Sequence, residues 1–329
     1  MMKKSTNKKV TKLLLISVFL VLIVSSAFAE GIKIVGHRGA AGLMPENTFA
    51  GFKKAMKIGV AAIELDVHLT SDKVVVVTHD YRLNPAITRD TQGNWLKERP
   101  LIKDLTLAKV QSYDVGKLNR STKYAEKYPK RKSVDGERIP TLNDVIKLVK
   151  STNGRTNLFI EIKTTPLKPE ESSSPEVLAR AVAKILKEEG FTDRARIISF
   201  DWRSLKRIKE IMPEVRTAHV TIAYKDFDTI QEKKHGPSPW MAGFDIDDHG
   251  SIAEAIKAAG GECWTSNYVH ASGHGRGMTS ELVKKAHAIG LDVFVWTVNE
   301  KGDMKRMIKI GVDGIVTDRP DVLRSIVKK

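Results

Sequence analysis

Short apolar segments typical of buried strands alternate with amphipathic helical patterns along most of this 329-residue chain. The strand candidates lie at 32–35, 61–69, 157–162, 195–200, 215–220, 262–266, 291–297 and 313–317. Helical patterns separate most of them and include 175–189, 202–211, 252–259 and 279–288. Repeated strand–helix units over about 250 to 300 residues predict an α/β fold of the (β/α)8, or TIM-barrel, class. The run 244–247 is a competing strand candidate that this count leaves out.

The second strand candidate contains the segment 63–69, which alternates strictly between apolar and polar residues. In a strand, this pattern places Glu64, Asp66 and His68 on one face. Two carboxylates about 7 Å apart along a strand face can share a hard divalent cation. The same pattern also fits the solvent-exposed face of an edge strand. The segment therefore predicts either a metal pair or an exposed edge.

A turn centred on Asp72 then reverses the chain into the β-rich run 74–77. Pairing outward from this turn sets Thr78 opposite Asp66, and the next residue is His79. A tight hairpin would therefore bring the imidazole of His79 back beside the acids. We interpret 74–77 as an antiparallel arm at the barrel mouth, not as a strand of the barrel.

Polar side chains recur at or just after the ends of the strand candidates. They are His37, Glu64, Asp66, Glu161, Lys163, Asp201, Trp296 and Asp318. Such residues taken singly are most often solvated loop residues or strand-end caps. A (β/α)8 barrel, however, gathers its functional side chains at the carboxyl ends of its strands. Histidines, cations and carboxylates at that end suit metal-assisted cleavage of a phosphate ester.

The motifs taken together resemble those of the glycerophosphodiester phosphodiesterase family. They are His37-Arg38-Gly39, Glu46-Asn47-Thr48, Glu64-x-Asp66, Thr70-x-Asp72, His79-Asp80, Glu161-Ile162-Lys163, Ser199-Phe200-Asp201, Trp296-Thr297-Val298-Asn299 and Thr317-Asp318. The resemblance extends over about 32–322. It implies hydrolysis of glycerophosphodiesters such as glycerophosphocholine and glycerophosphoethanolamine to sn-glycerol 3-phosphate and an alcohol.

The resemblance also implies a metal site. Glu64, Asp66 and Glu161 would hold one divalent cation. Three carboxylates suit Ca2+ or Mg2+, and they offer none of the sulfur or imidazole ligands that zinc prefers. We rank Ca2+ first, because an exported protein meets more free calcium.

The remaining implied roles concern the phosphate and the protons. Arg38 and Lys163 would bind the phosphodiester oxygens, and Trp296 would form part of the pocket wall. His37 and His79 would act as general acid and base, in an order that the sequence does not assign. The attacking group is either a glycerol hydroxyl, which gives a cyclic phosphate that water then opens, or water itself. The sequence does not separate these two routes.

Other candidates carry weaker indications. Glu46 belongs to a family motif, and His68 could touch the phosphate or the leaving group. Phe200 could line the pocket or lie in the core. The loop 270–277 is rich in Gly and His, which fits either a flexible connection or a substrate-contacting loop.

The segment from about 81 to 138 is basic and polar and shows no clean period. We expect it to form an insertion after the hairpin, beside the barrel mouth, where it could cap the substrate. Within it, the run 117–132 holds seven Lys and Arg against one Glu, a pattern typical of a solvated face.

The first 29 residues carry five lysines and no acidic residue, followed within them by the apolar run 13–24. This run is too short to span a bilayer comfortably and leads to a small-x-small site ending at Ala29. It predicts a signal peptide over 1–29, with an uncleaved anchor as the alternative. The remaining chain, 30–329, would be a single catalytic domain located in a periplasm or outside the cell.

Charge and cysteine content bear on possible partners. Removing the five signal lysines from a net charge of +16 leaves +11. This excess is spread along the chain without interleaved aromatic residues, which argues against nucleic acid but permits peripheral contact with an anionic membrane. The oligomeric state is not determined. The single cysteine, Cys263, is expected to be a small buried core residue.

Two other functions stay open. One is a phospholipase of the same barrel type that acts on intact or lyso lipids. An apolar rim at the barrel mouth would favour it, and 81–138 holds no apolar run. The other is a surface protein that binds phosphodiesters without catalysis. Such a protein should have lost a metal ligand or a catalytic histidine, and none is missing from this sequence.

Overall fold

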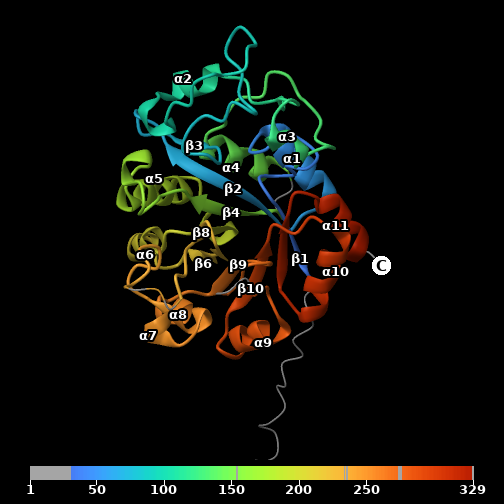
Figure 1. Ribbon diagram of the computed structural model, residues 1–329. Coiled ribbons are helices and arrows are strands. Elements are labelled where there is room, and N and C mark those ends of the chain that lie inside the picture. The colour runs from blue at the N-terminus through green and yellow to red at the C-terminus, as the bar shows by residue number, and fades with distance from the viewer. Residues whose placement is uncertain (1–30, 153–154, 233, 235, 273–275, 328–329) are drawn as a thin grey trace, which may run out of the picture. The chain divides into compact units, whose positions relative to one another are not determined.

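Eight parallel strands close into a barrel in the computed structural model (Figure 1). The barrel closes because β1 (Lys33–Gly36) pairs in parallel with both β2 (Ala62–Leu69) and β11 (Gly314–Thr317). The intervening strands, from β2 round to β11, are β4 (Asn157–Ile162), β5 (Ala195–Ser199), β6 (Arg216–Thr221), β9 (Cys263–Asn267) and β10 (Asp292–Trp296). These are the eight strands expected from the sequence, and the predicted TIM barrel is confirmed.

The structure describes residues 31–327, except 153–154, 233, 235 and 273–275. The predicted signal peptide and its cleavage site lie outside the described residues. Ile32–Lys329 cluster as one compact unit. None of the described helices combines the length and hydropathy that a membrane span requires.

Helices surround the barrel and connect its strands (Figure 1). They are α1 (Phe49–Ile58), α4 (Leu142–Ser151), α5 (Pro175–Glu188), α6 (Trp202–Ile211), α8 (Ile252–Ala258), α9 (Ser280–Ala288), α10 (Lys301–Ile310) and α11 (Pro320–Val327). Several begin at a side chain that accepts a hydrogen bond from the first turn, such as Thr48, Thr141 and Ser174. Their apolar faces pack on the outer side of the strands and form the main core.

The alternation in β2 separates the core from the barrel interior. Ile63, Leu65 and Val67 belong to the outer core, between the strands and the helices. Glu64 and Asp66 point the other way and are only 3% and 1% exposed. The edge-strand interpretation is therefore wrong, because β2 lies between two parallel neighbours and both acids are buried.

The predicted hairpin forms in the predicted register. β3 (Val75–Val77) pairs antiparallel with β2, with Val77 opposite Val67. The amide of Thr78 donates to the carbonyl of Asp66 over 3.0 Å. The hairpin therefore carries the chain back toward the acids, immediately before His79.

The competing strand candidate 244–247 is not a strand. Phe244 closes a turn on Met241, and α7 (Ile246–His249) begins directly afterwards. The carboxylate of Asp245 caps this helix by accepting a hydrogen bond from the amide of Asp247. A strong helix cap thus overrides a short apolar run.

The insertion is more ordered than its sequence indicates. It contains η1 (Ile102–Asp104), α2 (Leu107–Ser112) and α3 (Lys123–Glu126). With residues beside it, it forms an apolar cluster of its own, made of Val76, Leu83, Ile102, Val110, Tyr113, Val115 and Ile139. The insertion is therefore a packed part of the domain, with a small apolar core, and not an irregular loop.

Candidate active site

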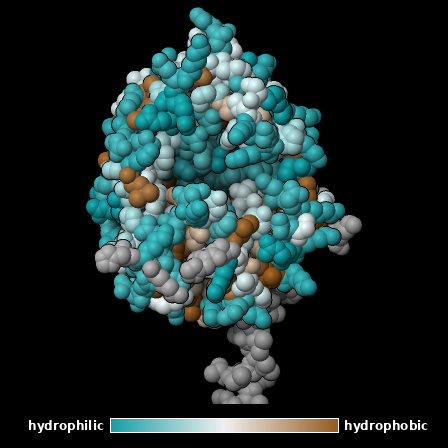
Figure 2. All heavy atoms as spheres, in the orientation of Figure 1, coloured by the Kyte–Doolittle hydropathy of each residue, from teal (hydrophilic) through white to brown (hydrophobic). Residues whose placement is uncertain are grey.

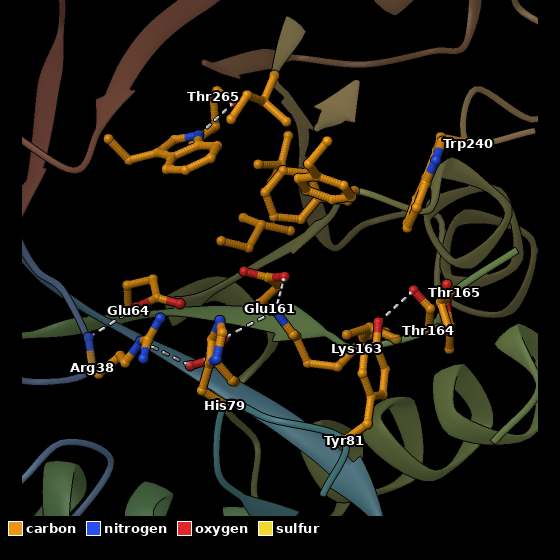
Figure 3. Close-up of a pocket in the computed structure, with 18 of the residues that line it drawn as sticks. Arg38, Glu64, His79, Tyr81, Glu161, Lys163, Thr164, Thr165, Trp240 and Thr265 are labelled. Atoms are coloured by element: carbon orange, nitrogen blue, oxygen red, sulfur yellow. Dashed lines mark hydrogen bonds and ion pairs between the residues drawn. The ribbon is translucent and has the colours of Figure 1, made fainter. Parts of the chain in front are cut away.

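A pocket of about 510 Å³ opens at the carboxyl end of the barrel. The space-filling view shows the molecule hollowed near the middle of this face (Figure 2). Most of the predicted site residues line the pocket: His37, Arg38, Glu64, Asp66, His79, Glu161, Lys163, Phe200 and Trp296. Figure 3 shows the acids and cations on one side of this space and aromatic rings on the other.

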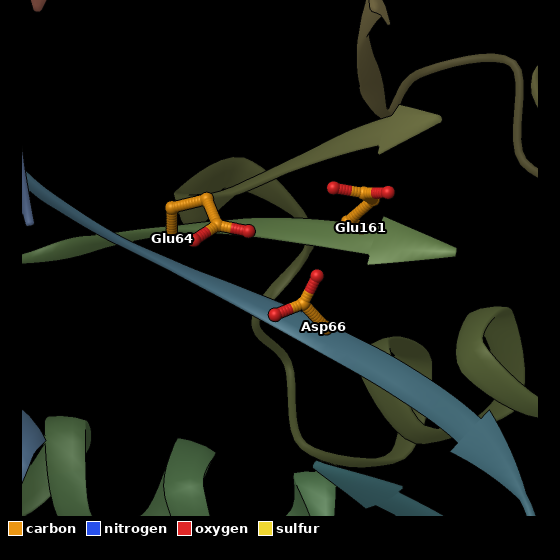
Figure 4. A group of neighbouring side chains, drawn as sticks. All are labelled: Glu64, Asp66 and Glu161. Atoms are coloured by element: carbon orange, nitrogen blue, oxygen red, sulfur yellow. The ribbon is translucent and has the colours of Figure 1, made fainter. Parts of the chain in front are cut away.

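Three carboxylates converge at the base of the pocket (Figure 4). Glu64 and Asp66 come from β2, and Glu161 is the register partner of Asp66 on β4. One oxygen from each lies within 4.8 Å of the others, and all three side chains are buried. Burial, together with the negative charges of Asp66 and Glu161, raises the pKa of Glu64 to about 8. Crowded all-oxygen ligands of this kind fit a hard divalent cation.

Two buried cations border the carboxylates. Lys163 Nζ lies 2.9 Å from Glu161 Oε1 and 3.6 Å from Asp66 Oδ1. Arg38 has left-handed backbone geometry, with φ of 48°, and its amide donates to Glu64 Oε2 over 2.9 Å. Arg38 Nε is buried, forms no hydrogen bond to a described residue and lies 3.7 Å from Asp66 Oδ2. Because Arg38 lines the pocket, a donor without a hydrogen bond suits an anionic ligand there.

His37 is held by a carboxylate. Its Nδ1 lies 2.7 Å from Asp318 Oδ1, and its Nε2 lies 3.9 Å from Glu64 Oε2. Asn299 Nδ2 in turn donates to Asp318 Oδ2 over 2.7 Å. Burial is the largest single influence and acts to lower the pKa of His37, but the charge and hydrogen bond of Asp318 together with the charge of Glu64 outweigh it and raise this pKa overall. The sequence placed Asp318 at a strand end without assigning this role.

His79 has a similar partner but an opposite pKa shift. Its Nδ1 lies 2.6 Å from Asp80 Oδ1, and Asp80 Oδ2 accepts a hydrogen bond from Asn84. Desolvation of the ring lowers the pKa of His79, and the positive charges of Arg38 and Lys163 lower it further. The pKa values of the two histidines are therefore shifted in opposite directions.

The insertion contributes to the position of Arg38. Arg38 Nη1 donates to Glu46 Oε1 over 2.8 Å, while Tyr124 Oη and Arg131 Nη1 donate to Glu46 Oε2 over 2.6 and 2.8 Å. The guanidinium of Arg131 also lies 3.7 Å from the ring centroid of Tyr128. Glu46 does not line the pocket, so it acts through Arg38. Arg131 is only 4% exposed, so interpreting 117–132 as a solvated face is wrong for this residue.

A sequence model described as the "Glycerophosphoryl diester phosphodiesterase family" matches residues 37–322 of this chain. The chain belongs to this family. The predicted family and enzyme class are therefore confirmed.

Individual relatives and solved structures agree over nearly the whole chain. The glycerophosphodiester phosphodiesterase of Caldanaerobacter subterraneus subsp. tengcongensis is 33% identical over 297 residues, covering 90% of this chain and 98% of that protein. The crystal structure of a putative glycerophosphoryl diester phosphodiesterase from Silicibacter pomeroyi has a TM-score of 0.79 and 32% identity, covering 91% of this chain and 93% of that one. A human lysophospholipase D is 28% identical over 300 residues, covering 89% of this chain and 85% of that protein.

His68 of the phosphodiesterase lies behind the pocket and not in its lining. Its Nε2 is 3.1 Å from the carbonyl oxygen of His79, and its ring packs edge-on against Tyr81 with centroids 5.2 Å apart. Burial lowers the pKa of His68 to about 4. The described contacts of His68 are thus with Tyr81 and with the backbone that carries His79, and its possible contact with the phosphate or the leaving group stays a prediction.

Aromatic rings form the opposite wall of the phosphodiesterase pocket. The centroids of Trp296 and Phe200, of Phe200 and Phe227, and of Phe227 and Trp240 are each 5.4 Å apart. Trp296 lines the pocket, as predicted, and so does Phe200, for which the sequence left a core position as the alternative. Two further wall residues were not predicted from the sequence: Trp240, and Phe227, which lies in a small hairpin of β7 (Ala223–Tyr224) and β8 (Phe227–Asp228). The loop 270–277 lies partly outside the described residues and supplies none of the described lining.

The stability of the cation-free phosphodiesterase is expected to fall as pH rises from about 6.5 to 8.5. The folded state keeps the proton of Glu64 up to pH about 8, whereas the unfolded chain releases it near 4.5. The folded state therefore binds more protons in this interval, and stability is lost as pH rises, by at most about 1.4 kcal/mol per pH unit for this group. The raised pKa of His37 acts in the same direction.

Thermal unfolding in EDTA at several pH values tests this expectation. The variant Glu64→Gln should show a flatter dependence, and added Ca2+ should abolish the decline, because a cation favours the deprotonated carboxylates. A melting temperature that rises over this interval in EDTA would contradict the assignment of the raised pKa to Glu64.

Proposed function

We propose that this chain hydrolyses glycerophosphodiesters such as glycerophosphocholine and glycerophosphoethanolamine to sn-glycerol 3-phosphate and an alcohol. One observation carries the proposal. Two histidines, each held by its own carboxylate, and two buried cations border the same pocket as three converging acids. Family membership supports the same activity. The N-terminal sequence further supports action outside the cytoplasm, after export.

We infer that the three acids hold one divalent cation, with Ca2+ ranked ahead of Mg2+. The fit rests on three buried carboxylates with oxygens within 4.8 Å of one another and on the raised pKa that their mutual repulsion helps to cause. When bound, a divalent cation stabilises negative charge at a phosphoryl group and lowers the pKa of a hydroxyl beside it. The bound cation would also favour the folded state, because it would remove the repulsion among the three carboxylates.

Arg38 and Lys163 would bind the nonbridging phosphate oxygens. Arg38 lines the pocket, and its Nε is a buried donor without a hydrogen bond to a described residue, 3.7 Å from Asp66 Oδ2. Lys163 stays charged despite its burial, because the negative charges of Glu161 and Asp66 outweigh desolvation and raise its pKa. The contacts of the Arg38 guanidinium and the Lys163 ammonium would strengthen as negative charge builds on the phosphoryl group.

The opposite pKa shifts of the two histidines support an order of proton transfer. His79, whose pKa is lowered, would be neutral and accept the proton of the attacking hydroxyl. His37, whose pKa is raised, would be protonated and donate to the oxygen of the leaving alcohol. The attacking group is a glycerol hydroxyl or water. In the first case, a cyclic phosphate forms and is opened by water with the two roles reversed.

A second candidate function is hydrolysis of lysophospholipids in the same pocket. The aromatic wall and Leu167 offer an apolar surface beside the acids, which suits a substrate with an acyl chain. The similarity to a human lysophospholipase D supports this candidate.

The test is an assay of purified protein with glycerophosphocholine, first in EDTA and then with added Ca2+ or Mg2+. A coupled dehydrogenase measures glycerol 3-phosphate, and choline release from lysophosphatidylcholine is measured in parallel. We expect both cations to restore glycerol 3-phosphate release, with Ca2+ the more effective. Choline release from the lysolipid alone would favour the second candidate. No product from either substrate with either cation would overturn both.

A further inference from the structure

Exposed apolar side chains gather on one side of the barrel mouth. Among the described residues, the large apolar side chains that are prominently exposed are Leu167 at 60%, Val177 at 42%, Tyr224 at 42%, Phe227 at 37% and Val269 at 41%. All but Val177 lie on loops that follow β4, β6 and β9, at the carboxyl end of the barrel. We call Leu167, Tyr224, Phe227 and Val269 the apolar rim.

The apolar rim is built into the structure at the pocket mouth. Tyr224 and Phe227 are register partners in the β7–β8 hairpin, and the Tyr224 ring lies 4.7 Å from that of His270. The amide of Ala223 donates to the carbonyl of His270, which ties the hairpin to the loop that carries Val269. Leu167 and Phe227 also line the pocket. The rim thus continues the aromatic wall outward to the surface.

Positive charge flanks the same mouth. The basic run 117–132 belongs to the insertion, and its Tyr124 lies 3.3 Å from Arg38 Nη1, at the pocket. Several of its cations are exposed to solvent: Arg120, Lys123, Lys127, Lys130 and Lys132. Exposed Lys168 and Lys225 adjoin the rim itself, where Glu170 and Asp226 are exposed acids and Lys168 Nζ lies 3.9 Å from Glu171 Oε1. Exposed apolar groups beside clustered cations are the combination that binds an anionic lipid interface.

We propose that the apolar rim and the basic run 117–132 dock this protein on an anionic lipid surface, with the pocket mouth turned toward it. The rim would enter the boundary between headgroups and acyl chains, and the lysines would contact anionic headgroups. Docking would present lipid-derived phosphodiesters to the pocket. Its benefit to the protein therefore rests on the proposed function. The binding itself does not depend on hydrolysis and is measured without it.

The test is cosedimentation with vesicles of equal parts phosphatidylglycerol and phosphatidylcholine. The double variant Tyr224→Ser/Val269→Ser removes two rim side chains that do not line the pocket. It should bind about tenfold more weakly than the wild type. Val177→Ser is the matched control, since its side chain is similarly exposed but lies on α5, outside the rim loops. It should change binding less than about twofold. All proteins share one N-terminus, so the predicted signal segment cannot produce the difference.

A charge variant tests the other half of the surface. Lys130→Gln/Lys132→Gln should weaken binding to the anionic vesicles by about tenfold and leave binding to pure phosphatidylcholine unchanged. The proposal would be overturned if the wild type did not bind the vesicles. It would also be overturned if the wild type and the rim variant bound them equally well. A third outcome would also overturn it. If the wild type forms a concentration-dependent dimer on ultracentrifugation, and the rim variant loses this dimer but still binds vesicles, the rim joins two copies of the chain and does not bind lipid.

Hydrolysis of soluble glycerophosphocholine separates this inference from the proposed function. The rim variant should retain activity within about twofold of the wild type, because neither Tyr224 nor Val269 lines the pocket. A wild type that binds vesicles but hydrolyses no phosphodiester would overturn the proposed function and leave the docking surface supported. A wild type that hydrolyses glycerophosphocholine but does not bind vesicles would overturn the docking surface and leave the proposed function supported.

Discussion

Replacing His79 by alanine is expected to lower kcat for glycerophosphocholine by about 10²- to 10⁴-fold, with little change in KM. The imidazole lies at the pocket with Nδ1 held by Asp80, and its lowered pKa suits a base near neutral pH. His37→Ala should cause a loss of similar size, because it removes the group proposed to protonate the leaving alcohol. Steady-state kinetics at saturating cation measure both losses.

The two histidines can be told apart by their pH profiles and by the leaving group. In the wild type, the acidic limb of kcat/KM should report deprotonation of His79 and the alkaline limb deprotonation of His37. A glycerophosphodiester of p-nitrophenol has a leaving group that departs without protonation. This substrate should rescue His37→Ala and leave His79→Ala impaired. Rescue of His79→Ala instead would reverse the assigned roles.

Replacing Glu161 by glutamine is expected to weaken calcium binding by about 100-fold or more and to lower activity about 10³-fold at limiting calcium. The substitution removes one of three negative charges that converge within 4.8 Å. It also removes the anionic partner of Lys163, whose Nζ lies 2.9 Å from Glu161 Oε1. Calorimetric titration with Ca2+ measures the affinity, and activity against calcium concentration measures the consequence.

Glu171→Gln is the matched control for the metal ligand. Glu171 also lines the pocket, but its carboxylate pairs with Arg82 and Lys168 and lies outside the group of three acids. Calcium affinity should be nearly unchanged in this variant. Equal losses of affinity in both variants would mean that the overall negative charge of the pocket, and not the three-acid site, attracts the cation.

The barrel and the acids were predictable because their signals are local. Each strand is a short apolar run, and the alternation around Glu64 and Asp66 assigns their side chains to one face. The hairpin register follows from its turn, so the approach of His79 needs no information from the rest of the chain. Parallel pairing then brings Glu161 beside Asp66, a step that becomes foreseeable only once the barrel is assumed.

The contacts that Glu46 makes with the insertion were not predictable, because the residues involved are distant in sequence. Tyr124 and Glu46 are 78 positions apart, and Arg131 reaches the carbonyl of Ala41 across 90 positions. Nothing in a basic segment without a period indicates that one of its arginines is buried. Likewise, Phe227 and Trp240 join the aromatic wall through tertiary packing that no local pattern records.

The carboxylate that Arg38 shares with the insertion makes the position of Arg38 depend on the docking of the insertion. Glu46 receives hydrogen bonds from a barrel loop through Arg38 and from the insertion through Tyr124 and Arg131. Without the docked insertion, Glu46 would keep one of its three hydrogen-bond donors, and the carboxylate that orients Arg38 would itself be unanchored. The direction of the Arg38 guanidinium at the pocket therefore depends on the segment whose sequence is least regular.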